Sequence, residues 1–113
     1  MPNMQFQIKA TGIELTPTIS AYVEDKLGKL AKLITSMDPD TVLVHVEVGK
    51  TTDHHKKGKI FRAEVRMRLP GCTIYTEESA EELYAAIDLI ANEARRQIVT
   101  QKEKNKTRVK PRI

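Results

Sequence analysis

Two neighbouring stretches of the chain alternate apolar and polar residues, and this alternation limits the choice of fold more than any other feature. Residues 42–48 have valine at every second position, and residues 61–69 have an apolar residue at every second position. Because successive side chains of a strand point to opposite faces, each stretch predicts a strand with one buried and one polar face. The segment 51–59 joins them, so we expect a β-hairpin.

Two helices are predicted from apolar residues that recur every three or four positions. The first begins at Thr16 and Pro17, because threonine is a favourable N-cap and proline suits the first helical position. Its apolar stripe runs to about residue 34. The second helix is expected to begin at Ser79, where Glu82 three residues later would complete a capping box. It is expected to extend towards Lys104.

Residues 4–10 and 72–77 predict two further strands. The first precedes the first helix, and the second lies between the hairpin and the second helix. The element order is therefore β-α-β-β-β-α. One apolar sheet face and two apolar helical stripes are buried most economically in two layers. We therefore predict an α+β sandwich in which a four-stranded sheet carries both helices on one face. The first helix is then a crossover, which makes the first two strands parallel if they pair.

The composition predicts a single soluble domain. The chain has 113 residues, of which 40% are hydrophobic and 30% charged, and this length and balance suit one globular core. No apolar stretch approaches the roughly 18 residues of a membrane span, and the first residues lack the pattern of a signal peptide. The single Cys72 cannot form an internal disulfide. We therefore expect a cytoplasmic protein with no membrane partner.

The hairpin segment TTDHHKKGK, residues 51–59, raises the question of a metal site. Asp53, His54 and His55 are possible ligands, but adjacent histidines rarely reach one ion and no further ligand has a suitable spacing. We favour the alternative of a solvated basic loop. The chain also lacks a nucleophile elbow, a glycine-rich phosphate loop and an HExxH motif. We therefore expect no enzymatic activity, no metal, no cofactor and no small-molecule substrate.

Positive charge is concentrated at the C-terminal end of the chain. The formal net charge is +4, and residues 102–112 contain six basic residues and one acidic residue. A terminal run of this kind either improves solubility or binds polyanions. We divide the chain into an α/β domain, residues 1–101, and a basic C-terminal tail, residues 102–113.

Both predicted helices also carry cations beside their apolar stripes. At about 100° per residue, Lys26 and Lys29 share one flank of the first helix, with Lys32 further round. Arg95 and Lys102 share one flank of the second helix, and the arginine after Arg95 lies on its outer side. Charged helix faces are often only solvated. Two such rows together with a basic loop and a basic tail favour a surface that binds a polyanion.

The kind of polyanion follows from the scarcity of aromatic residues. The chain has two phenylalanines, three tyrosines and no tryptophan, which is a poor supply for a platform that stacks single-stranded bases. A surface of helical cations that reads backbone shape suits structured RNA better than a specific DNA sequence.

Two segments resemble those of ribosome hibernation-promoting factors, a family also called ribosome-associated inhibitors, ribosomal subunit interface proteins or sigma-54 modulation proteins. They are GIELTPTISAYVEDKLGKL, residues 12–30, and LYAAIDLIANEARRQI, residues 83–98. The resemblance covers about residues 4–105. The positions that match the family pattern are Gly12, Glu14, Thr16, Pro17, Lys26, Lys29, Leu30, Tyr84, Ala86, Ile87, Asp88, Arg96 and Gln97.

The resemblance implies a fold similar to a double-stranded-RNA-binding domain. It also implies binding to ribosomal RNA in the decoding region of the small ribosomal subunit, which keeps idle ribosomes inactive in hibernation, stationary phase or stress. Helix cations of the family face ribosomal RNA. Motif position and helix faces together give an expected RNA-binding set of Lys26, Lys29, Arg95, Arg96, Lys102 and Lys104. Of these, Arg95 and Lys104 come from the helix-face argument alone, and family members commonly have an acid at the position of Arg95.

Two other functions stay open at this point. A general double-stranded RNA-binding module predicts similar affinity for any long duplex, and a protein-interaction domain that modulates transcription predicts binding that survives high salt. Long members of the family also carry a second domain that pairs ribosomes into dimers. The chain is therefore either a short form or the N-terminal part of a long form.

Overall fold

The computed structural model of the chain describes residues 4–34, 42–51, 60–69 and 71–108, with side chains as far as Lys104. The hairpin residues Asp53, His54 and His55 lie outside the described residues. The elements in chain order are β1 (Gln5–Thr11), α1 (Pro17–Gly28), the 3-10 helix η1 (Lys29–Leu33), β2 (Leu43–Lys50), β3 (Phe61–Leu69), β4 (Cys72–Ala80) and α2 (Leu83–Arg108).

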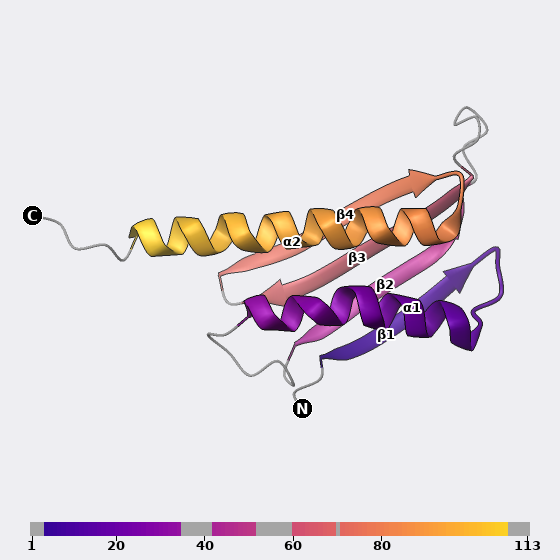
Figure 1. The fold of residues 1–113 in the computed structure, drawn as a ribbon, viewed down its shortest axis with the longest axis horizontal. Coiled ribbons are helices and arrows are strands. Elements are labelled where there is room, and N and C mark those ends of the chain that lie inside the picture. The colour runs from indigo at the N-terminus through magenta and orange to yellow at the C-terminus, as the bar shows by residue number, and fades with distance from the viewer. Residues whose placement is uncertain (1–3, 35–41, 52–59, 70, 109–113) are drawn as a thin grey trace, which may run out of the picture.

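The strands form one sheet in the order β1-β2-β3-β4. β1 and β2 are parallel, and the pairs β2–β3 and β3–β4 are antiparallel. Both helices lie on the same face of this sheet, α2 across β3 and β4 and α1 across β1 and β2 (Figure 1). The predicted α+β fold, with its parallel first pair and two-layer arrangement, is confirmed.

The core lies between the sheet and the helices, and the predicted alternation supplies it. Val46 of β2 lies opposite Val65 of β3, and both are buried. The helices close the core with the apolar stripes that the sequence predicts. Their buried residues are Ile19, Val23, Leu27 and Leu30 from α1 and η1, and Leu83, Ala86, Ile87, Ile90, Ala91, Ala94 and Ile98 from α2.

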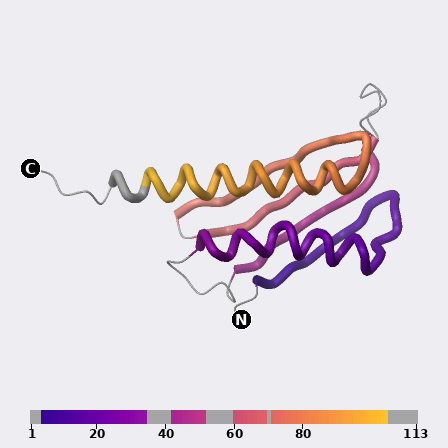
Figure 2. Tube along the Cα trace, in the orientation of Figure 1, coloured from indigo at the N-terminus to yellow at the C-terminus, as the bar shows by residue number. Residues whose placement is uncertain are grey.

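The two helices run in the same direction, and α2 is much the longer. Figures 1 and 2 show that α2 continues well past the sheet. Its 26 residues correspond to about 39 Å at 1.5 Å per residue. Residues 102–108, the first part of the predicted basic tail, continue α2. In the described part of the chain, neither helix has an apolar stretch that could cross a membrane.

The predicted start of the second helix at Ser79 is wrong. Ser79 belongs to β4, where it lies opposite Arg62 of β3. α2 begins at Leu83, and the carbonyl of Glu82 accepts its first helical hydrogen bond from the amide of Ala86 at 3.1 Å. Glu82 is therefore the N-cap residue. Pairing along the whole length of β3 extends β4 to Ala80, and this long-range pairing prevails over a local capping signal.

Candidate nucleic-acid interface

A groove between α1–η1 and α2 brings together cations from both helices. It has a volume of about 340 Å³, and its cationic lining residues are Lys26, Lys29, Lys32 and Arg95. Asn92 adds an amide, and the aliphatic part of the lining consists of Leu30, Leu33 and Ala91. We call this feature the interhelical groove. The predicted flanks of the two helices therefore adjoin at Lys26, Lys29 and Arg95.

Lys32 belongs to the interhelical groove although an ideal α-helix would place it further round. From Lys29 onward the chain is a 3-10 helix, as in the bond of 3.1 Å from the amide of Ile34 to the carbonyl of Ala31. Side chains three residues apart eclipse one another in a 3-10 helix. Lys32 therefore follows Lys29 on the same side, which a constant 100° per residue does not predict.

The groove cations differ in how firmly acidic residues hold them. Lys29 lies 3.8 Å from Asp25, one turn earlier in α1, and both side chains are about two-thirds exposed. An exposed pair of this kind contributes little stability. Lys32 and Arg95 form no ion pair with any carboxylate of the described residues. Two of the four groove cations, Lys32 and Arg95, therefore have no carboxylate partner among the described residues, while Lys26 and Lys29 each lie near one acid.

Next to the groove, a cluster of four residues joins the helices. Tyr22 and Lys26 lie one turn apart on α1, and Tyr84 and Asp88 lie one turn apart on α2. The Tyr22 hydroxyl donates a hydrogen bond of 2.6 Å to Asp88 Oδ1, and the rings of Tyr22 and Tyr84 meet edge to face at 4.7 Å. The hydrogen bond to the Asp88 carboxylate, together with burial, raises the pKa of Tyr22 to about 12. We call these four residues the interhelical cluster.

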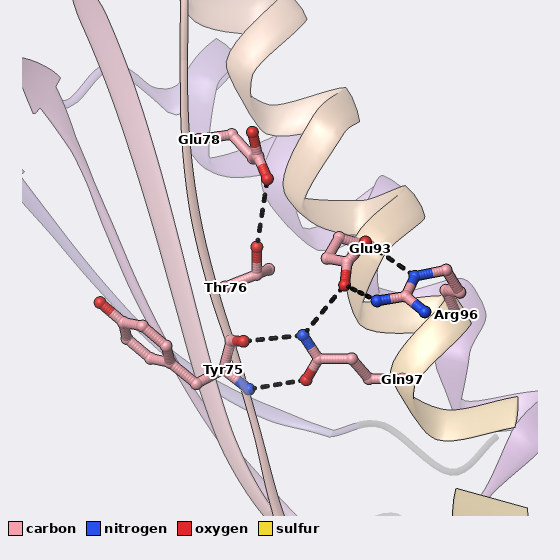
Figure 3. A network of polar contacts seen from close by, with 6 residues as sticks. All are labelled: Tyr75, Thr76, Glu78, Glu93, Arg96 and Gln97. Atoms are coloured by element: carbon pink, nitrogen blue, oxygen red, sulfur yellow. Dashed lines mark hydrogen bonds and ion pairs between the residues drawn. The ribbon is translucent and has the colours of Figure 1, made fainter. Parts of the chain in front are cut away.

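Arg96 does not join the interhelical groove. It binds both carboxylate oxygens of Glu93, and this hydrogen bonding lowers the pKa of Glu93. Glu93 also accepts a hydrogen bond of 3.3 Å from Gln97, whose amide in turn contacts the backbone of Tyr75 in β4 (Figure 3). Arg96 itself is two residues, or about 200°, before the buried Ile98, and its side chain is 68% exposed, so it lies on the outer side of α2 as the sequence predicts.

The remaining predicted residues lie further along α2, where both side chains are exposed. Lys102 is seven residues, or about two turns, after Arg95 and so continues its row. Lys104 is nine residues, or about two and a half turns, after Arg95 and so lies on the opposite side of the helix. Of the six predicted residues, Lys26, Lys29, Arg95 and Lys102 thus lie on the groove side, and Arg96 and Lys104 lie on other sides of α2.

The open face of the sheet has a different character. Arg62 of β3 forms ion pairs with Glu47, Glu64 and Glu77 from three strands, and its side chain is only 20% exposed. Its guanidinium therefore links three strands through ion pairs. The exposed Arg66 and Arg68 are further along β3, in a hollow of about 610 Å³ on the open sheet face that includes His45.

Comparisons with known proteins agree with this fold. Residues 6–106 match the model of a family described as sigma 54 modulation protein / S30EA ribosomal protein. Three curated relatives are named ribosome hibernation promotion factor: those of Lactococcus lactis subsp. cremoris (32% identical), Picosynechococcus (37%) and Staphylococcus aureus (33%). The alignments cover 96%, 90% and 94% of this chain but 54%, 51% and 50% of the relatives. The chain thus spans about half the length of these relatives.

Two solved structures are similar to this one. The N-terminal domain of Protein Y from Thermus thermophilus is 31% identical, with a TM-score of 0.62 over 85% of this chain and 94% of that domain. A ribosomal subunit interface protein from Coxiella burnetii is 22% identical, with a TM-score of 0.69 over 88% of this chain and 99% of that protein, and it supports the fold alone. The predicted resemblance is therefore confirmed, and the chain belongs to the sigma 54 modulation protein / S30EA ribosomal protein family.

Proposed function

We propose that this domain binds ribosomal RNA in the decoding region of the small ribosomal subunit and keeps idle ribosomes inactive. It acts in the cytoplasm by occupying its site, without catalysing a reaction. The main support for this function is the interhelical groove, where Lys26, Lys29, Lys32 and Arg95 lie close together. The name of the curated relatives, ribosome hibernation promotion factor, supports the same function.

Backbone phosphates are the part of RNA that suits this groove. Cations held close together on two helices can neutralise neighbouring phosphates and release their counterions. Lys26 lies in the last turn of α1, and Lys29 and Lys32 lie in η1 directly after it. The negative end of a helix dipole favours cations at such positions, so the fold tolerates this concentration of charge before RNA binds.

The predicted RNA-binding residues then have two different roles. Lys26, Lys29 and Arg95, together with Lys32, form the primary contact, and Lys102 extends it along α2. Arg96 and Lys104 lie away from the groove side of α2 and contact a separate part of the RNA. Residues 1–101 supply the folded ribosome-binding domain, and the basic segment 102–113 adds reach. The described part of that segment continues α2, so its cations are carried on a helix that projects past the sheet.

Co-sedimentation with purified bacterial small ribosomal subunits at increasing salt tests the proposal. If about five cations meet phosphates, log affinity falls against log salt with a slope of magnitude roughly 3 to 5. The double variant Lys26→Glu with Lys29→Glu should lose binding and relieve inhibition of translation together. Each new carboxylate faces an acid, Asp88 or Asp25, which lowers the melting temperature, so binding is measured well below the melting range.

The matched control is Arg66→Glu with Arg68→Glu, which makes the same charge change on exposed residues of the open sheet face. Arg62 is unsuitable as a control because its replacement would leave three carboxylates unpaired. Greater damage from the control pair would mean that the opposite face meets the ribosome. Equal affinity for any long RNA duplex would indicate a general RNA-binding module. Binding that survives high salt and ribonuclease would indicate a protein-interaction domain.

A further inference from the structure

Asp88 is an acid at the edge of the interhelical groove, next to its cationic lining. Its side chain is 43% exposed, and its carboxylate lies 3.6 Å from Lys26 Nζ. A negative charge at this position repels RNA, so by simple electrostatics it weakens the proposed function. Its contacts suggest what offsets this cost.

The carboxylate holds the two α1 residues that face it. One oxygen, Oδ1, accepts the hydrogen bond of Tyr22 at 2.6 Å and also lies closest to Lys26. The Lys26 ammonium lies 5.4 Å from the centre of the Tyr22 ring, within the range of a cation–π contact. Tyr84 closes the arrangement from α2 by packing edge to face against Tyr22. Asp88 is thus the polar centre of the interhelical cluster.

Lys26 is less exposed than the next groove lysine. The Lys26 side chain is 35% exposed, against 64% for Lys29, whose partner Asp25 is equally exposed. A free lysine side chain loses considerable rotamer freedom when it binds a phosphate. A lysine that is already held in place loses less, and this lowers the cost of binding.

We propose that Asp88 is a positioning residue, which fixes Lys26 and Tyr22 at the edge of the interhelical groove so that Lys26 is ready to meet a phosphate. This inference rests on the proposed function, because it assigns Asp88 a part in RNA binding. Asp88 does not itself contact RNA. It acts through Lys26, and the benefit of a preorganised cation exceeds the repulsion between its own carboxylate and the phosphates.

The variant Asp88→Asn distinguishes this role from that of an ordinary surface charge, because the two predict opposite signs. Removing an acid that only repels phosphate should tighten binding to RNA. Removing a positioning residue should weaken binding by about fivefold, which corresponds to roughly one well-placed ionic contact. It should also reduce the magnitude of the salt slope by about 1.

The matched control is Asp25→Asn, which makes the same charge change beside the same groove. Asp25 pairs only loosely with Lys29, so we expect this variant to bind purified bacterial small ribosomal subunits at least as tightly as the parent. A double-mutant cycle identifies the residue through which Asp88 acts. Lys26→Gln should cost little further affinity once Asp88 is asparagine, whereas Lys29→Gln should cost as much as it does in the parent.

Two measurements without ribosomes test the geometry directly. Ultraviolet titration should show a lower Tyr22 pKa in Asp88→Asn than in the parent, because the charged acceptor is lost. NMR relaxation of the parent should show a more restricted terminal methylene at Lys26 than at Lys29, and this needs no variant that could fail to fold.

The outcomes separate failure of this inference from failure of the proposed function. A parent protein that does not bind the subunits overturns the proposed function, and the inference with it. If the parent binds, the inference alone is overturned by Asp88→Asn binding as tightly as the parent, or by full additivity with Lys26→Gln. Equal mobility of Lys26 and Lys29 in the parent overturns it as well.

Discussion

The side-chain amide of Gln97 on α2 makes the pair of hydrogen bonds with Tyr75 that a neighbouring strand would make. Gln97 Nε2 donates to the Tyr75 carbonyl at 2.9 Å, and Gln97 Oε1 accepts from the Tyr75 amide at 3.2 Å (Figure 3). β4 is an edge strand, and an open edge can pair with other chains. The carboxylate of Glu93, held by Arg96, contacts Gln97 Nε2 and fixes the orientation of the amide. Gln97 therefore covers the middle of this edge.

Gln97→Ala should expose that edge position. We expect a loss of about 1 kcal/mol in the free energy of unfolding, since both hydrogen bonds are near solvent, and faster hydrogen exchange of the Tyr75 amide. Gln101→Ala, one turn later on α2, is the control and should leave this exchange unchanged. Unaltered protection of Tyr75 in Gln97→Ala would show that the amide does not cover the edge in solution.

Alanine substitutions at Thr16 and Ser79 should have different effects on stability. Thr16 Oγ1 accepts a hydrogen bond of 3.1 Å from the amide of Ile19 and caps α1, so Thr16→Ala should cost about 1 kcal/mol. Ser79 lies in β4 rather than at a helix start, so Ser79→Ala should change stability by less than about 0.5 kcal/mol. Chemical denaturation measures both, and a larger loss for Ser79→Ala would restore the capping role that the sequence suggests.

Two glycines should respond to alanine with opposite signs. A Cβ at Gly49 in β2 would lie 2.1 Å from the carbonyl oxygen of Thr11 in β1, so Gly49→Ala should cost about 2–3 kcal/mol by forcing the strands apart. A Cβ at Gly28 would meet no atom within 4 Å, and its backbone is helical. Gly28→Ala should therefore stabilise the protein by about 0.5–1 kcal/mol. Equal effects in thermal unfolding would contradict this view of the β1–β2 contact.

Tyr22 predicts a specific loss of stability at alkaline pH. Its pKa is raised from 10.0 to about 12 in the folded protein, so the folded state holds this proton more tightly than the unfolded state. The resulting stability is complete below about pH 10 and is lost as the pH rises through about 12. Tyr22→Phe keeps the ring but lacks the hydroxyl, so its deficit relative to the parent should shrink over this range. A deficit that stays constant up to pH 12 would show that Tyr22 is not bound to Asp88.

The sequence predicts features that depend on periodicity and misses those that depend on partners distant in the chain. Alternation and apolar stripes identify each strand and helix, and helix flanks correctly bring Lys26 and Arg95 together. The end of β4 depends on pairing with β3, which the residues around Ser79 do not reveal. Likewise, Gln97 matches the family pattern, but its contact with the edge of β4 follows only from where α2 lies on the sheet.

Lys32 is the groove residue that sequence periodicity does not place, and it provides the last prediction. Because η1 brings it beside Lys29, Lys32→Glu should weaken binding to small ribosomal subunits about as much as Lys29→Glu does. Lys50→Glu is the matched control, since Lys50 is exposed at the end of β2 and does not line the groove. Equilibrium binding at several salt concentrations measures all three variants.

The outcomes show whether the RNA enters the interhelical groove at η1. If Lys32→Glu keeps its affinity, as Lys50→Glu should, while Lys29→Glu loses affinity, the RNA contacts α1 but does not enter the groove at η1. Loss of affinity by both Lys29→Glu and Lys32→Glu, with similarly reduced salt slopes, is the result expected when phosphates contact both lysines.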